Sequence, residues 1–331
     1  MATIGSNALT LSDWSRRIED DGKIATIVEI LAQTNEILED IMWVEGNLAT
    51  GHKTTIRSGF PTLGWRRLNY GVQPSKSRTV QVVDSCGMLE GYSEIDKDLA
   101  NLNGNTAEFR LSEDRAFLEK MMQDAATAFI YGNANTDPEQ IMGLAPRYSS
   151  LSAENAENIL DGGGTGSDNT SVWLVTWDAL TCHGIFPKGK ITGLQHKDLG
   201  EETLTDSQSP GGLYQGYRSH YKWDMGLTLR DWRYVVRIPN IDVSDLSKDA
   251  STGADLIDLM VQAIELLPTQ GLGRPVFYCN KTIKSYLRRQ ITNKDNVNLT
   301  FENVAGKHVL MFDGIPVKKV DAILNTEEAV S

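Results

Sequence analysis

The sequence predicts an α+β protein in which a long β-arm projects from a folded body. Three observations lead to this prediction. Residues 52–92 hold two extended, basic runs joined by a turn-rich region, residues 112–131 follow with a helical pattern, and the last third of the chain mixes helix and strand patterns. Because an isolated two-stranded ribbon is only marginally stable in water, such an arm indicates a protein that contacts other chains.

The bulk composition is that of an ordinary globular protein. The chain has 331 residues, of which 40% are hydrophobic and 23% charged, enough for two domains or one large one. The three cysteines (Cys86, Cys182 and Cys279) are far apart and form no CxxC motif, so we predict neither a zinc site nor a disulfide framework. No apolar run approaches the roughly 18 residues that span a membrane, and the first residues lack a signal-peptide pattern. We therefore expect a protein that is made in the cytoplasm.

The charge is distributed unevenly along the chain. The net charge of −12 argues against a generic nucleic-acid binder, which would show a basic footprint. Residues 52–92 nevertheless carry a net charge of +4, so the rest of the chain carries −16. The six cations of the arm are Lys53, Arg57, Arg66, Arg67, Lys76 and Arg78. A basic arm is attracted to the acidic body of a neighbouring copy. The alternative is a solvated hairpin without a partner.

The N-terminal half is predicted to consist of a helix, the arm and a second helix. Residues 24–42 have helical spacing of apolar side chains, which Asn35 interrupts, and we expect this segment to dock elsewhere. Strands of ten or more residues give the arm a reach of about 30 Å. Its turn region holds too many breakers for a compact hairpin, namely Pro61, Gly64, Gly71 and Pro74. Ser112 is the expected N-cap of the helix over 112–131, and Gly132 is the expected stop.

The second half is predicted to be β-rich and then mixed. We expect strands over 172–177 and 227–238, with Trp232, Tyr234, Val236 and Ile238 on one face, and long loops between 145 and 240. A helical stripe over 256–267 ends at Pro268, and an apolar strand covers 275–279. Asn280 is the expected cap of a helix to about 290, and Asp313-Gly314 predicts a tight hairpin.

Residues 184–190 match the GxxxxGK spacing of a phosphate-binding loop. In such a loop the backbone amides would surround phosphates and Lys190 would reach the terminal ones. However, Ile191 replaces the expected Ser or Thr, Phe186 and Pro187 lie inside the loop, and no helix pattern follows. We do not predict nucleotide binding.

Two other groups of polar residues are candidates for chemistry. Ser171, Asp178 and His183 contain the residue types of a hydrolase triad, but the chain has no GxSxG motif. His196, Asp198, Glu201 and Glu202 could be metal ligands, as could Asp242, Asp245 and Asp249, but neither set has a metal-site spacing. We predict no catalytic residue, no metal site and no cofactor.

The residues with the composition of a protein interface lie in the arm. Trp65 stands next to Arg66 and Arg67 in the turn region, and Trp and Arg are enriched where proteins bind each other. The alternative for Trp65 is a local cap over the hairpin. The predicted subunit-interface residues are Lys53, Arg57, Trp65, Arg66, Arg67, Lys76 and Arg78.

The order of these parts resembles the major capsid proteins of tailed bacteriophages, which have the Hong Kong 97-like fold. The matching stretches are FIYGN at 129–133, IMGLAPR at 141–147, RPVFYCN at 274–280 and FDGIPV at 312–317 before Asp321. Residues 184–200, with Trp223 and Arg237 downstream, are similar to podovirus-type members. This similarity gives the apparent phosphate loop a structural explanation.

The resemblance implies a division of the chain into five parts. These are an N-terminal arm with a helix (1–48), an extended β-loop (49–95), a peripheral domain with a long spine helix (96–147), an axial domain (148–306) and C-terminal strands that return to the peripheral domain (307–331). It also implies that the extended loop lies over an adjacent subunit. We do not predict a covalent cross-link, although Lys53 and Lys76 lie on the arm.

The function that the resemblance implies is structural, without catalysis. The chain would self-assemble into hexamers and pentamers of an icosahedral shell that encloses double-stranded DNA, in a virion assembled in the host cytoplasm. The expected partners are other copies of the chain, a separate scaffold, a portal, a cement or decoration protein, and DNA contacted non-specifically, with no membrane. The alternatives are an encapsulin-like compartment shell and a soluble hydrolase with a β-arm lid and a pocket near His183 or His196.

Overall fold

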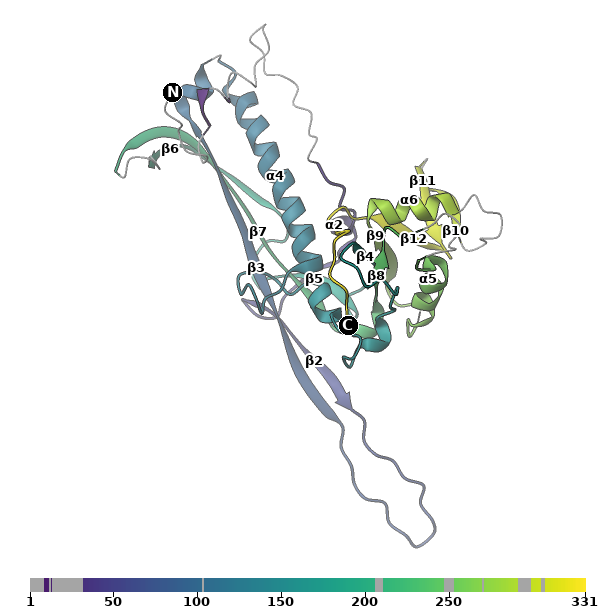
Figure 1. The fold of residues 1–331 in the computed structure, drawn as a ribbon. Helices are drawn as coiled ribbons and strands as arrows, with labels where there is room; N and C mark the ends of the chain where they lie inside the picture. Colours follow the sequence, from purple (N-terminus) through teal and green to yellow (C-terminus); the bar gives the residue numbers. More distant parts are fainter. Residues whose placement is uncertain are drawn as a thin grey trace.

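A compact domain, a long narrow platform and a projecting arm make up the molecule in the computed structural model (Figure 1). The structure describes residues 9–11, 13, 32–102, 104–205, 211–246, 253–269, 271–290, 299–304 and 307–331. Helices and strands occur together throughout these residues, which confirms the α+β prediction.

Strand β3 (Arg78–Asp96) belongs to both the arm and the body. Its first part pairs antiparallel with β2 (Gly51–Gly59), and from Cys86 onward it pairs antiparallel with β7 (Leu213–Leu229). The prediction that residues 52–92 form an arm projecting from the body is therefore wrong for residues 86–92, which pair with β7. The local pattern could not show this, because the partner strand lies far along the chain.

Helix α4 (Thr106–Tyr131) lies along β3 and β7 and forms the second layer of the platform (Figure 1). The predicted N-cap at Ser112 is wrong, because the helix begins earlier and the Ser112 hydroxyl donates to the Phe109 carbonyl inside it at 2.7 Å. Phe109 accounts for the earlier start, since it is buried in a cluster with Ile95. The helix ends before Gly132, as predicted.

The compact domain is built around β4 (Asn169–Trp177), every residue of which is buried. β4 pairs antiparallel with β8 (Val235–Asp242) and with β9 (Arg274–Cys279). The sheet extends from β9 through β12 (Ile315–Lys319), β11 (Lys307–Phe312) and β10 (Leu299–Val304). On its other side the sheet reaches the platform through β5 (Cys182–Phe186), which pairs with β7. The remaining elements are β1 (Trp43–Glu45) beside β5, β6 (Gln195–Thr205) beside β7, α3 (Lys97–Asn101) before α4, and the short turns η1 (Ala145–Tyr148) and η2 (Ala156–Asn158).

Side chains of β4 point alternately into two hydrophobic cores. Val172 and Leu174 face the core that α5 (Leu256–Glu265) and α6 (Lys281–Gln290) cover, together with Phe277 of β9. Trp173 and Val175 face the other core, which includes the C-terminal end of α4. Because successive side chains of β4 point to opposite faces and both faces are buried, the strand contributes to both cores. It thereby joins the compact domain to the platform.

Several elements of the second half agree with the sequence. Strand β4, helices α5 and α6 and the hairpin between β11 and β12 lie where we predicted them. The Asn280 side chain accepts from the Thr282 N–H at 3.0 Å, and Asp313 and Gly314 both have positive φ, at 48° and 78°. These are short-range signals, which the local sequence contains in full.

The predicted single strand over 227–238 is wrong. β7 ends at Leu229, and η3 (Trp232–Tyr234) interrupts the chain before β8 begins. The Asp231 carboxylate caps η3 by accepting from the Arg233 N–H, which redirects the backbone. As a result Trp232 packs against the core on the α4 side, whereas Tyr234 belongs to the core on the α5 side.

The predicted helix over 24–42 is mostly not formed where the structure describes it. Residues 24–31 lie outside the described residues, and from 32 to 42 only α2 (Ile37–Asp40) is an α-helix. The backbone N–H of Glu36 donates to the Lys319 carbonyl and that of Asp321 to the Thr34 carbonyl. Hydrogen bonds to the C-terminal segment therefore replace those of a longer helix, and the segment docks on the compact domain.

Buried polar side chains hold the C-terminal segment against the rest of the fold. Arg237 Nη2 donates to the Glu327 carboxylate at 2.8 Å, and both side chains are only 5% exposed. The hydroxyls of Ser171 and Tyr131 also donate to Glu327. Since Tyr131 ends α4, this network joins the platform to the compact domain.

Candidate subunit interface

The arm leaves the body as a two-stranded ribbon and ends in an open loop. β2 and β3 pair from Gly51 with Ser85 to Gly59 with Arg78. Residues 60–77 contain no helix or strand, and they point away from the body (Figure 1). A strand rises about 3.3 Å per residue, so the paired part alone carries the loop roughly 30 Å from its base.

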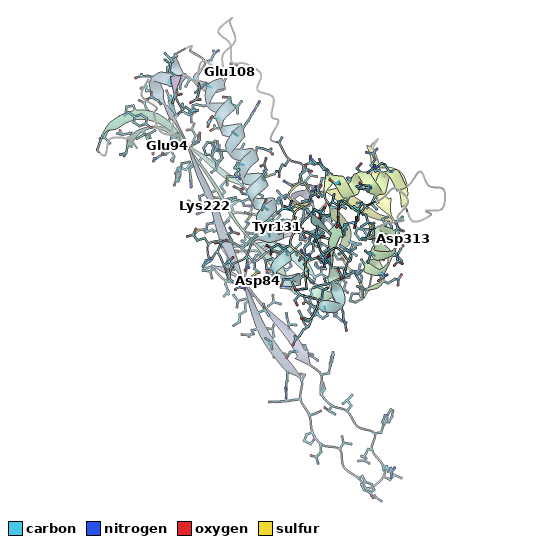
Figure 2. The ribbon with its side chains drawn as sticks, in the orientation of Figure 1. Asp84, Glu94, Glu108, Tyr131, Lys222 and Asp313 are labelled. Atoms are coloured by element: carbon cyan, nitrogen blue, oxygen red, sulfur yellow. The ribbon has the colours of Figure 1, made fainter. Side chains whose placement is uncertain are left out.

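The loop exposes large apolar side chains. Trp65 is fully exposed, and Leu63, Leu68 and Phe60 are each more than 80% exposed. From Asp84 toward the loop, the side chains of the arm stand apart from those of the body (Figure 2). Trp65 therefore does not cap the hairpin, and the loop presents the kind of surface that proteins bury when they associate.

All seven predicted interface residues are exposed on this arm. Lys53 and Arg57 lie on β2, Arg78 begins β3, and Trp65, Arg66, Arg67 and Lys76 lie in the loop. The seven span the arm from its base to its tip and do not converge on one point. Within the described residues none of the six cations forms an ion pair, so the arm offers both charge and apolar surface to another molecule.

Polar contacts fix the base of the arm on the body. Arg147 Nη2 donates to the Asp84 carboxylate at 2.8 Å and to the Leu227 carbonyl at 3.1 Å. Arg230 Nη2 donates to His52 Nε2 at 2.9 Å. Asp84 and His52 are both 5% exposed, so the arm is anchored at its base and open at its tip.

Two histidines at this base are held in their neutral form. The imidazole of His52 stands edge-on to that of His183, with ring centroids 5.7 Å apart. Burial, followed by the nearby Arg230 guanidinium, lowers the pKa of His52. The same two causes lower the pKa of His183 to about 4. Sequence reasoning considered His183 only as a catalytic residue and missed its place beneath the arm.

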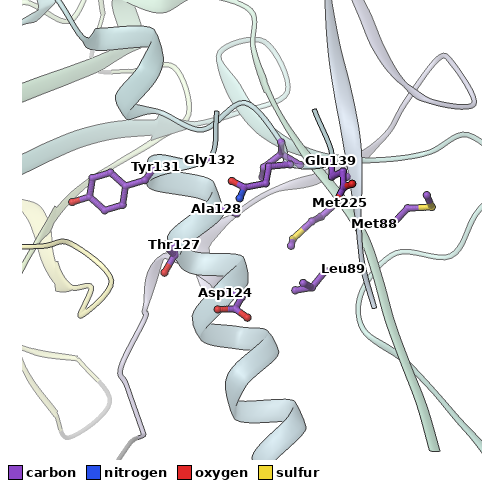
Figure 3. A pocket seen from close by; sticks show the side chains of 12 residues that line it. Met88, Leu89, Asp124, Thr127, Ala128, Tyr131, Gly132, Glu139 and Met225 are labelled. Carbon is purple, nitrogen blue, oxygen red and sulfur yellow. The ribbon is translucent and has the colours of Figure 1, made fainter. Parts of the chain in front are cut away.

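A cavity of about 320 Å³ lies between β3 and the C-terminal end of α4 (Figure 3). Apolar side chains, among them Met88, Leu89 and Met225, line one side of it. Asp124 and Glu139 add carboxylates. This cavity has the mixture of apolar and acidic groups that complements the arm, and neither His183 nor His196 lines it.

The phosphate-loop match does not form a nucleotide site. Gly184 lies within β5, where a Cβ would come within 3 Å of Ile41 and Trp43, so its role is close packing. The ammonium group of Lys190 pairs with the buried Asp224 carboxylate at 2.8 Å. Gly184 and Lys190 of the motif thus have structural contacts.

The other candidate residues also have structural contacts. Ser171 is bonded to Glu327 and Arg237 in the buried network, apart from His183 at the arm base. His196 stacks on Tyr221 with ring centroids 4.8 Å apart. Along β6, Asp198 pairs with Arg110, Glu201 with Lys97 and Glu202 with Arg218. Among the described residues no group of three or more His, Cys, Asp or Glu side chains could hold a metal ion.

Sequence reasoning missed one charged surface, on α6. Lys281, Lys284, Arg288 and Arg289 border a shallow depression that Lys319 also lines. The signal was present as KTIKSYLRRQ, ten residues with four cations and no acid. The sequence analysis used Asn280 to predict the start of this helix and did not consider the cations that follow.

Comparisons with known proteins identify close relatives. The family model for major capsid protein GP7 matches residues 19–331. A cryo-EM structure of bacteriophage Epsilon15 is 44% identical, with 100% of this chain and 99% of that chain covered and a TM-score of 0.80. No curated protein matches the chain.

More distant structures are also similar to this chain. The capsid of bacteriophage JBD30 is 10% identical over 90% of this chain and 95% of that chain, with a TM-score of 0.47. The holo-SrpI encapsulin complex from Synechococcus elongatus PCC 7942 is 9% identical over 72% of this chain and 99% of that chain, with a TM-score of 0.44. Among the described residues, no helix is long and apolar enough to cross a membrane.

Proposed function

Because the chain belongs to the major capsid protein GP7 family, we propose that it builds the shell of a phage by laying its arm on a neighbouring copy of itself. The family match favours a phage capsid over an encapsulin-like compartment and over a hydrolase. The fold is the Hong Kong 97-like fold that the resemblance implied.

The observation that carries this proposal is the unpartnered tip of the arm. Burying one large apolar side chain contributes about 1.5–3 kcal/mol, and residues 60–77 expose several of them. Association itself costs several kcal/mol, so each arm contact is weak alone. A closed shell repeats the contact on every subunit, which makes the whole assembly stable.

Charge adds to this attraction. Residues 52–92 carry +4 and the rest of the chain −16, and the six cations of this segment all lie on the arm, so the arm is drawn to the body of another copy. Salt screens exposed charges beyond about 10 Å at 0.1 M ionic strength. The cavity between β3 and α4, with Asp124 and Glu139, is a surface on the neighbour with matching chemistry.

Each part of the chain would have a separate role in the shell, as the family resemblance implies. Residues 1–48 would form an N-terminal arm, 49–95 the extended loop, 96–147 a peripheral domain on α4, 148–306 an axial domain at the capsomer centre, and 307–331 the returning C-terminal strands. Hexamers and pentamers of such subunits would close an icosahedral shell around double-stranded DNA. A separate scaffold, a portal and a cement or decoration protein would complete a virion assembled in the host cytoplasm.

Electron microscopy of the purified chain, alone and with candidate scaffold, tests the proposal. The wild-type chain should form closed shells. The variant Arg66→Glu/Arg67→Glu should stay folded and form none, because its tip repels an acidic neighbour. Lys188→Glu/Lys197→Glu, with the same charge change at exposed positions outside the arm, is the matched control. Wild-type particles that stay monomeric or dimeric under all conditions would contradict the proposal, and normal shells from the arm variant would refute the role of its charge.

A further inference from the structure

The base of the arm contacts the body through polar side chains. On the arm, His52, Thr54 and Asp84 are all buried. On the body, His183 and Thr228 are buried and lie directly opposite each other where β5 pairs with β7. Separating two polar surfaces hydrates their polar groups and exposes little apolar area, so the loss of hydrophobic stabilisation is small. The arm is therefore docked on the body by contacts that can open without disrupting either hydrophobic core.

The contact between Arg230 and His52 requires a neutral imidazole. Arg230 Nη2 lies 2.9 Å from His52 Nε2. A guanidinium can only donate hydrogen bonds, so His52 Nε2 accepts this one and carries no proton. A proton bound at Nε2 would turn the hydrogen bond into two opposed donors and would place two positive charges side by side. The bond that docks His52 therefore exists in one protonation state of the ring.

The His183 ring extends this dependence on protonation to the body. It stands edge-on to the His52 ring, with 5.7 Å between the ring centroids, so a proton on either ring places a charge beside the other. Burial is the largest cause that lowers the pKa of both histidines, and the Arg230 guanidinium lowers both further. Two rings and one guanidinium thus share a buried site that favours a single positive charge.

Carboxylates near the two rings act in the opposite direction. Asp84 raises the pKa of His52, and Asp178 raises that of His183, through its charge and its backbone carbonyl. Arg147 already pairs with Asp84, since its Nη2 lies 2.8 Å from the Asp84 carboxylate. The net shift of both histidine pKa values is downward, so the burial and the guanidinium outweigh the carboxylates.

Beyond the docked residues a cleft separates the arm from the body. The cleft holds about 430 Å³ between β2 and the segments that carry Leu180 and Arg230. The ribbon joins the body where Gly51 pairs with Ser85 and where the next residue, Cys86, begins its pairing with β7. A bend at this junction would move His52 away from the body and leave the pairing of β2 with β3 intact (Figure 1).

We propose that His52 and His183 form a proton-sensitive latch, which holds the arm on the body while both rings are neutral and releases it when they bind protons. The released ribbon swings about its junction at Gly51 and Cys86. The latch is a property of a single chain, so it goes beyond the proposed shell and does not depend on it. In a shell, proton uptake would change the direction in which the arm leaves its subunit.

The sign of the pH dependence follows from the docked and released states. In the released arm the rings face water and have an ordinary pKa of about 6.5, whereas the pKa of docked His183 is about 4. The released state binds more protons below pH 6.5, so the ratio of released to docked arms rises as the pH falls. His183 alone can raise this ratio by up to about 300-fold, and His52 acts in the same direction.

The distance between two spin labels on the full-length, unassembled chain tests the latch. Gln81→Cys places one label on the exposed side of the arm, and Leu180→Cys places the other across the cleft. Cys86→Ala removes the native cysteine that is not fully buried. We expect one short distance above pH 7, and a longer distance that appears below pH 6.5 and grows toward pH 4. Labels at Leu180→Cys and Lys188→Cys, both on the body, are the control and should keep one distance.

Histidine variants separate the latch from a general effect of acid. His52→Gln retains an acceptor for Arg230 without a titrating ring, so it should show less of the longer distance than the wild type. His52→Gln/His183→Phe removes both rings and should keep the short distance down to pH 4. His196→Gln changes a histidine that stacks on Tyr221 in the platform, and this matched control should respond like the wild type. Circular dichroism at each pH shows which variants are folded.

Two results would overturn the proposal. One is a wild-type chain that keeps the short distance down to pH 4. The other is a longer distance that grows equally in the wild type and in the folded variants of His52. The measurement needs no shell, so failure of the chain to assemble would count against the proposed function alone and would leave the latch result readable.

Discussion

The centre of the compact domain and the tip of the arm contain similar side chains in opposite surroundings. Trp173 and Trp177 of β4 are 1% and 2% exposed, whereas Trp65 is 105% exposed. The first two stabilise the fold of one chain, and Trp65 contributes nothing until a second chain covers it. The comparison separates folding from assembly, so substitutions in the two regions should affect different measurements.

The largest expected effect is on folding, in the buried network of the compact domain. Arg237→Met leaves the Glu327 carboxylate buried without its cation, which should reduce the free energy of unfolding by about 3–5 kcal/mol. Urea denaturation measures the loss. Arg233→Met, which removes the partner of the more exposed Asp231, is the matched control and should cost less than about 1 kcal/mol. Equal losses from the two variants would contradict the distinction between buried and exposed pairs.

The next effect concerns pH at the base of the arm. The pKa of His183 is about 4 in the fold against an ordinary 6.5, so below pH 6.5 the unfolded chain binds a proton that the folded chain does not. Stability should therefore fall as pH drops from 6.5 to about 4, by about 3 kcal/mol from this residue, and its contribution should change no further below that.

The variant His183→Phe isolates this effect. Its free energy of unfolding should vary less between pH 6.5 and 4 than that of the wild type, as measured by urea denaturation at each pH. His52 should continue to contribute in the same direction, since its pKa is also lowered. An identical pH dependence in variant and wild type would show that His183 is not held neutral.

The smallest expected change in free energy is at the tip of the arm, although its effect on assembly is large. Trp65→Ala should leave the urea midpoint unchanged and raise the concentration needed for assembly by about 10- to 100-fold, from a loss of about 1.5–3 kcal/mol per contact. Light scattering measures the threshold. Ile191→Ala, at another exposed apolar side chain, should shift it little. A Trp65 variant that unfolds more readily would break the comparison between the two regions.

The sequence predicted those parts of the fold that depend on neighbouring residues. The cap at Asn280, the hairpin at Asp313-Gly314 and the strand over 172–177 each need only a few adjacent side chains, and all are present. The pairing of Cys86 with Gly226 was missed, because it joins strands far apart in the chain. The break at Asp231 was missed because the alternation of apolar residues continues across it.

The candidate interface was predictable in part for the same reason. The charge of the arm and the position of Trp65 can be counted from the sequence, and the structure adds that the tip is fully exposed. The cavity between β3 and α4 could not be predicted, since it is formed by Met88, Asp124, Glu139 and Met225 from four separate segments. The cations of α6 can be read from the sequence as a run. The side of the helix on which they lie could not be predicted, because it depends on which side chains of the helix the core buries.

The central claim, that the arm tip lies on another copy of the chain, can be tested by placing a photo-crosslinking amino acid at position 65 in assembled shells. Irradiation should join neighbouring subunits into covalent dimers and larger products. The same group at Lys197, outside the arm, serves as the control. Mass spectrometry should locate the crosslink near β3 and α4 of the partner. Shells that assemble normally but give only unlinked or internally linked chains from position 65 would contradict the account.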